Sequence, residues 1–141
     1  MNPPIYPRSP REVMSGWTYL PRLVDKIRLH LAGKLHPDYQ ANFCQKGFDV
    51  LWFQAAGVTP EQLVGVVRGT LTDGEVADWT LKNVHRNEAQ KAAHREAVLN
   101  HGRQSEELQA LLLKRKTDAG LAQRDDITCF VDFIDADEQR G

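Results

Sequence analysis

The strongest candidates for chemistry are four charged residues that fall within about two turns of a predicted helix, namely Arg22, Asp25, Lys26 and Arg28. Residues three apart on a helix are neighbours, so Asp25 can contact both Arg22 and Arg28. A carboxylate between two arginines stays ionised and orients them, and their remaining N–H groups can bind a carboxylate or phosphate in a bidentate manner. The alternative is a structural network in which Asp25 orders both arginines against the acidic C-terminal end.

Aromatic residues gather in the same part of the sequence and could line a groove beside this helix. They are Trp17, Tyr19, Tyr39, Phe43, Phe48 and Trp52, with Asp49 among them. Aromatic side chains line pockets for flat ligands, whereas large aromatic residues at helical spacing usually pack in a core. The ligand-binding candidates are Trp17, Arg22, Asp25, Arg28, Asp49 and Trp52.

Other reactive side chains lack the spacing that their chemistry requires. The five histidines form no His-x-x-x-His pair and the two cysteines no Cys-x-x-Cys pair, so no metal or cofactor is predicted. Lys46 could lower the thiol pKa of Cys44, but Cys44 and Cys129 stand among apolar residues, which favours buried thiols in a reducing compartment. The basic stretch 82–103 contains acidic residues and no aromatic residue, so it does not indicate nucleic-acid binding.

Apolar spacing predicts that a helix positions the charged run. Leu20, Leu23, Val24, Ile27 and Leu31 recur every three or four positions, and Gly33 predicts the end of this helix. Caps, glycine stops and similar spacing predict further helices over 48–57, 60–69, 73–84, 88–100, 106–116 and from Asp125 or Asp126 to Ile134. In the helix after Ser105, we expect Leu108, Leu111 and Leu112 in the core. The fold class is therefore all-α, a compact bundle of six or seven short helices.

The first 16 residues have a different composition from the rest. They hold Pro3, Pro4, Pro7 and Pro10, four of the seven prolines, and proline resists helix formation. We predict an extended N-terminal arm over residues 1–16 and a single helical domain over residues 17–141.

Charge is unevenly distributed although the net charge is only −1. Residues 1–70 carry 8 Lys/Arg and 5 Asp/Glu, whereas residues 117–141 carry 2 and 7. We expect the acidic C-terminal end to complement the basic N-terminal half, with an acidic face for a basic partner as the alternative. No long apolar run and no signal-peptide pattern is present, so we expect a soluble, cytoplasmic protein without membrane contact.

The run from Trp17 to Arg28 carries a resemblance to a known family. Its pattern, W-x-x-L-P-R-x-x-D-K-x-R, followed by Leu31-Ala32-Gly33 and later by Thr72-Asp73-Gly74-Glu75-Val76 and Trp79, resembles a family of bacterial proteins described as a domain of unknown function. The resemblance extends over most of the chain. It implies a small helical bacterial protein and carries no activity with it.

Two functional hypotheses follow from these observations. The first is a non-enzymatic binding protein that uses the Arg22, Asp25 and Arg28 face and the aromatic groove to hold an anionic small molecule. The second is a small enzyme acting on an anionic small molecule, with Asp25 or Asp49 as its polar centre, which requires a concave pocket around that carboxylate. A homodimer through the Ala-rich segment 87–100 is a further expectation.

Overall fold

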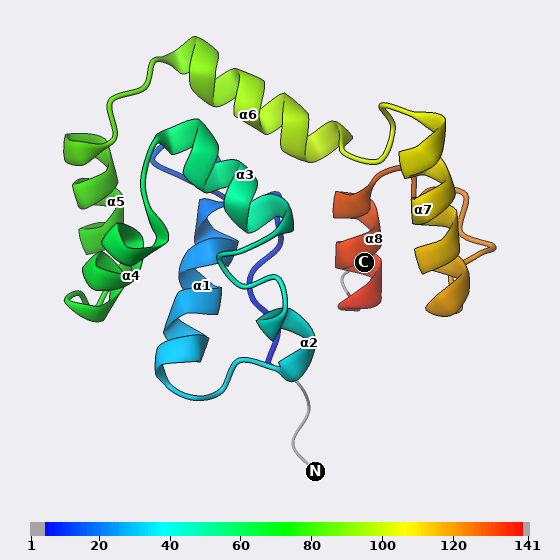
Figure 1. Cartoon of the computed structure of the whole chain (residues 1–141), viewed down its shortest axis with the longest axis horizontal. Helices are drawn as coiled ribbons and strands as arrows, with labels where there is room; N and C mark the ends of the chain where they lie inside the picture. Colours follow the sequence, from blue (N-terminus) through cyan, green and yellow to red (C-terminus); the bar gives the residue numbers. More distant parts are fainter. Residues whose placement is uncertain (1–4, 140–141) are drawn as a thin grey trace.

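Helices make up most of the computed structural model, which describes residues 5–139 (Figure 1). Within that range they are α1 (Leu20–Leu31), α2 (Pro37–Gln40), α3 (Gly47–Ala56), α4 (Pro60–Arg68), α5 (Asp73–Asn83), α6 (Glu88–Asn100), α7 (Glu106–Asp118) and α8 (Phe130–Asp137). The all-α fold class is confirmed. Because α2 is a single turn of four residues, seven longer helices correspond to the six or seven expected.

The helix α1 lies at the centre of the main core. Its predicted apolar stripe is buried at Leu20, Leu23, Val24 and Ile27, each 0% exposed. These side chains pack with residues of α3, α4 and α5 and with Trp17 and Trp52. Leu31, the last residue of the predicted stripe, is 38% exposed. Burial of the rest of this side of α1 fixes the positions of its polar residues, two of which, Arg22 and Lys26, are also buried.

A β-hairpin precedes α1 where the sequence predicted an extended arm. Strand β1 (Val13–Met14) pairs antiparallel with β2 (Trp17–Thr18). Ser15 and Gly16 both have positive φ, 54° and 80°, the conformation of a two-residue hairpin turn. The predicted boundary between arm and helical domain falls inside this hairpin. Pro3 and Pro4 lie outside the described residues, whereas Pro7 and Pro10 are buried.

The second half of the chain forms a lobe connected to the first through α6. In Figure 1, α6 spans the top of the molecule, and α7 and α8 lie on the opposite side from α4 and α5. Helix α6 contacts β2, α3 and α8, and a small apolar cluster of Val98, Cys129 and Val131 joins α6 to α8. Of the leucines expected in the core of α7, Leu112 is buried but Leu111 is 38% exposed.

The last helix begins four residues later than Asp126, which the sequence suggested as its cap. Asp126 instead forms a two-pronged ion pair with Arg124, with both N–O distances 2.8 Å. The backbone before α8 is held by Asp132, whose Oδ2 accepts from the Thr128 backbone N–H at 2.9 Å. Ile127, included in the predicted helix, is buried in the segment before it.

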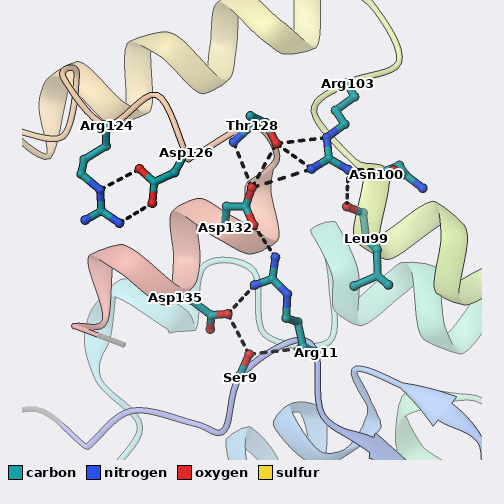
Figure 2. Close-up of polar contacts among 10 residues, drawn as sticks. All are labelled: Ser9, Arg11, Leu99, Asn100, Arg103, Arg124, Asp126, Thr128, Asp132 and Asp135. Atoms are coloured by element: carbon teal, nitrogen blue, oxygen red, sulfur yellow. Dashed lines mark hydrogen bonds and ion pairs between the residues drawn. The ribbon is translucent and has the colours of Figure 1, made fainter. Parts of the chain in front are cut away.

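Charge complementarity between the two ends of the chain is present in the fold. Arg11, just before the hairpin, pairs with Asp132 and with Asp135, the latter at 2.7 Å (Figure 2). Arg103 approaches Asp132 from the other side, with an N–O distance of 3.8 Å. The acidic face of α8 is therefore partly neutralised within the chain. Among residues 5–139, no helix has the length and apolar character needed to cross a membrane.

Candidate functional site

A cavity of about 840 Å³ lies between the α1–α3 part of the structure and the lobe formed by α6, α7 and α8. Its inner end is polar and is formed by Tyr19, Arg22, Lys26, Tyr39 and Glu138. Its walls are mixed. The apolar and aromatic part includes Phe48, Leu51, Ala97, His101, Phe130, Phe133 and Ile134, and the polar part includes His36, Asp38, Asn42, Lys46, Gln104, Arg115 and Asp137. A cavity of this size that combines an apolar and aromatic wall with polar groups is the usual form of a small-molecule site.

Lys26 is held at the inner end by a buried polar cluster. Its Nζ donates to Asp49 Oδ1 at 3.1 Å and to the Tyr19 hydroxyl at 3.3 Å. The Tyr19 hydroxyl donates to the same Asp49 oxygen, and the Cys44 backbone N–H donates to Asp49 Oδ2 at 2.9 Å. Burial lowers the pKa of Lys26 and raises that of Tyr19, because removing a group from water disfavours its charged form.

Arg22 forms a second buried cluster beside the first. Its two terminal nitrogens bind the two carboxylate oxygens of Glu138 at 2.9 and 2.6 Å. The Tyr39 hydroxyl donates to Glu138 Oε2 at 2.6 Å, and Arg22 also donates to the Arg8 carbonyl at 3.1 Å. Burial lowers the pKa of Arg22, but the hydrogen bond to Glu138 and the charge interactions with Glu138, Tyr19 and Tyr39 together outweigh it, and the pKa is raised overall. Arg22 therefore ties the N-terminal segment and the end of α8 to α1.

The Tyr39 ring lies between the two clusters. The Arg22 guanidinium carbon is 5.6 Å from the ring centre and the Lys26 Nζ is 5.7 Å from it. Both distances fall within the range of cation–π attraction. The two cations are thus held in place by carboxylates and by one aromatic face that also lines the cavity.

Aromatic rings form a continuous row along one wall. Phe48 lies 5.4 Å from His101, and His101 lies 5.2 Å from Phe130, measured between ring centres. Burial lowers the pKa of His101, so this ring is neutral at physiological pH. The wall therefore offers aromatic surface to an apolar or flat molecule.

A comparison with protein-family models supports the resemblance to a domain of unknown function. A family model described as "Domain of unknown function (DUF5069)" matches residues 5–140. The chain belongs to the DUF5069 family. No curated protein matches it closely enough to count as a relative.

The structure of this DUF5069 chain separates residues that the sequence grouped on one helix face. Asp25 does not contact Arg22 but accepts from Arg8, with an N–O distance of 2.9 Å. Arg28 pairs with Asp73 at the start of α5, and Arg8 joins Asp73 at 2.7 Å. This half-exposed network attaches the N-terminal segment to α1 and α5 and does not line the cavity. Sequence spacing missed it because Arg8 is 17 residues from Asp25.

The two tryptophan candidates lie in the core. Trp17 is 1% exposed and Trp52 0% exposed, and their rings meet edge to face with centres 5.9 Å apart. Neither lines the cavity. Asp49 is also fully buried and lies behind Tyr19 and Lys26. Of the six candidates, Arg22 alone forms part of the cavity surface.

Sequence reasoning missed Glu138 and the aromatic residues of α8. Phe130, Phe133 and Glu138 line the cavity although about ninety positions separate them from α1–α3 in the sequence. Cys44 is not activated by Lys46, because burial raises its thiol pKa to about 12. Within residues 5–139, no group of three His, Cys, Asp or Glu residues is arranged to hold a metal ion.

Gly102 packs closely against Phe130, which lines the cavity. Its φ is +109°, and a Cβ there would lie 2.9 Å from the Phe130 ring and 3.3 Å from the Phe130 backbone nitrogen. Gly102→Ala should therefore lower the free energy of unfolding by about 2–4 kcal/mol, through backbone strain and displacement of Phe130. Urea denaturation measures this loss.

Gly120→Ala is the matched control for the Gly102 variant. Gly120 also has a positive φ, +75°, but a Cβ there meets nothing within 4 Å. Gly120→Ala should lower the free energy of unfolding by only about 1 kcal/mol, because it adds backbone strain without a steric clash. Equal losses in the two variants would show that contact with Phe130 does not matter.

Proposed function

We propose that this DUF5069 chain is a binding protein whose cavity between α1–α3 and α6–α8 holds a small organic molecule with an apolar or aromatic body and an acceptor end, such as a carboxylate. The observation that carries the proposal is a buried ammonium group, that of Lys26, in the lining of a cavity of about 840 Å³ with an aromatic and apolar wall. Free space beside a buried charge is expected where a ligand completes the environment of that charge.

The hydrogen bonds of Lys26 support an acceptor at the ligand's inner end. An ammonium group has three N–H donors. Within the described residues, Tyr19 and Asp49 accept two of them, so the third is available to a carboxylate or carbonyl oxygen in the cavity. Asp49 does not line the cavity, so the ligand meets the cation before it meets that carboxylate.

Arg22 is less suited to hold the ligand than the sequence suggested. Its guanidinium already binds Glu138 with both terminal nitrogens and donates to backbone carbonyl groups. A ligand carboxylate would have to displace Glu138 to reach those donors. The proposal therefore assigns recognition of the acceptor end to Lys26 and a structural role to Arg22.

The enzyme hypothesis required Asp25 or Asp49 at a concave surface. Asp49 is fully enclosed and Asp25 is engaged by Arg8 outside the cavity. Neither carboxylate is positioned to touch a molecule in the cavity, so binding is the function that the geometry supports best. The free thiols Cys44 and Cys129 support a cytoplasmic location. The homodimer through α6 stays a prediction.

A titration with 2-naphthoate, an aromatic carboxylate, tests the proposed function. We expect saturable binding by isothermal titration calorimetry. Ala97 on α6 lines the cavity, so Ala97→Phe should place a ring inside it and weaken binding by at least about tenfold, a loss of about 1.4 kcal/mol.

Ala93→Phe is the control for this variant. Ala93 lies one turn earlier on the same helix, is exposed and does not line the cavity. It adds the same ring outside the site and should bind as the wild type does. Absence of 2-naphthoate binding by the wild type, or equal affinity in the two variants, would refute the proposal.

A further inference from the structure

We infer that Lys26 is a nucleophilic amine that captures an aldehyde or ketone in the cavity as a protonated imine. The inference rests on the proposed binding function and adds the chemical class of the ligand. It is carried by the position of Lys26, a residue of the cavity lining whose Nζ lies 3.1 Å from a proton acceptor, Asp49 Oδ1, and 3.3 Å from the Tyr19 hydroxyl.

The geometry around Lys26 provides the groups that imine formation needs. Asp49 Oδ1, 3.1 Å from the Nζ, can accept a proton from the ammonium group. The Tyr19 hydroxyl lies 3.3 Å from the Nζ and donates to Asp49, and Tyr19 is also a residue of the cavity lining. Tyr19 can therefore pass a proton between Asp49 and an oxygen atom of a bound ligand. Burial lowers the pKa of Lys26, which makes the neutral amine easier to reach, as in other lysines that form Schiff bases.

The reaction balances without any further reactant. Lys26 first transfers one proton to Asp49. The neutral Nζ then attacks the carbonyl carbon, the C=O π pair moves to oxygen, and one amine proton transfers to that oxygen to give a carbinolamine. The carbinolamine hydroxyl leaves as water with the proton that Asp49 returns through Tyr19, and the nitrogen lone pair forms the C=N bond.

The protonated imine carries the same charge as the starting ammonium group, so the same buried environment can hold it. An ammonium group and a carbonyl become a protonated imine and water, so the nitrogen keeps its single positive charge and Asp49 keeps its negative charge. The ion pair therefore survives the reaction, and no uncompensated charge is buried. The aromatic row of Phe48, His101 and Phe130 favours a carbonyl compound with an aromatic or apolar body.

Reductive trapping with 2-naphthaldehyde and sodium cyanoborohydride tests the inference. Intact-mass measurement detects the adduct, and peptide mapping assigns it to a lysine. Lys46 is the internal control because it also lines the cavity but is exposed. We expect labelling of Lys26 several-fold faster than labelling of exposed Lys46, because burial lowers the pKa of Lys26 and leaves more of its amine neutral, and we expect 2-naphthoate to protect Lys26.

The variant Lys26→Arg keeps the charge beside Asp49 and removes the nucleophile. The adduct whose formation 2-naphthoate blocks in the wild type should therefore be absent from this variant. If this variant does not fold, the comparison of Lys26 with Lys46 in the wild type decides the question. Labelling of Lys46 without labelling of Lys26, while 2-naphthoate still binds, would overturn the inference and leave the binding function in place. Failure of both labelling and 2-naphthoate binding would overturn both.

Discussion

Arg22→Ala should lower the free energy of unfolding by about 3–5 kcal/mol, the usual cost of removing one partner from a buried ion pair. Arg22 is 3% exposed and Glu138 6% exposed. The substitution removes the two hydrogen bonds that Arg22 donates to the buried Glu138 carboxylate, whereas the Tyr39 hydroxyl still donates to it. It also frees the end of α8 and the Arg8 segment from α1. Urea denaturation at neutral pH measures the loss.

Arg28→Ala is the control on the same helix. Arg28 forms an ion pair with Asp73, but both side chains are about one-third exposed, at 32% and 39%. Exposed ion pairs contribute little to stability because water screens them. We therefore expect Arg28→Ala to lower the free energy of unfolding by less than about 1 kcal/mol. If Arg22→Ala costs no more than Arg28→Ala, Arg22 is not the structural connection described above and becomes available as a ligand-binding group.

Asp49→Ala should have an effect of similar size, about 3–5 kcal/mol, because it leaves the Lys26 ammonium buried without its carboxylate. It also removes the acceptor of the Tyr19 hydroxyl and of the Cys44 backbone N–H. The pKa of Lys26 should fall further in this variant, since Asp49 is the neighbour that raises it most. Chemical denaturation gives the stability change, and NMR titration of the labelled Lys26 side chain gives the pKa change.

Asp38→Ala and a double variant serve as controls for Asp49. Asp38 also lines the cavity, but its side chain is 86% exposed, so its loss should change stability by less than about 0.5 kcal/mol. The double variant Lys26→Met, Asp49→Asn should lose less than Asp49→Ala, because no buried charge is left without a partner. A double variant less stable than Asp49→Ala would contradict the assignment of a buried ion pair.

Local sequence signals predicted most of the helices. The stripe from Leu20 to Ile27 and the capping boxes at Thr59 and Thr72 depend on residues within one helix or turn. Such signals fix where a helix begins and which side is apolar. The hairpin escaped prediction because each strand has only two residues, too few for an alternating pattern. The start of α8 was placed too early because Asp126 pairs with Arg124 instead of capping.

The cavity could not be predicted, because its two sides come from distant parts of the sequence. The i, i+3 spacing predicted an Asp25–Arg22 contact on the helix, but partners outside the helix decided the contacts of both residues. Arg22 turns to Glu138, 116 residues away, and Asp25 to Arg8. The charge imbalance between the chain ends predicted ion pairs between them, but not which residues would form those pairs. Local spacing does not distinguish Lys26 from the other cations of α1, because its burial depends on how the helices pack.

Chemical-shift mapping shows directly whether 2-naphthoate binds in the cavity between α1–α3 and α6–α8. In ¹H–¹⁵N spectra of the labelled protein, we expect saturable shifts at the backbone amides of Phe48, Leu51, His101 and Phe133 and at the Lys26 side chain, with α4 and α5 unaffected. Shifts centred on α4 and α5, or no shifts at saturating ligand, would contradict binding in this cavity.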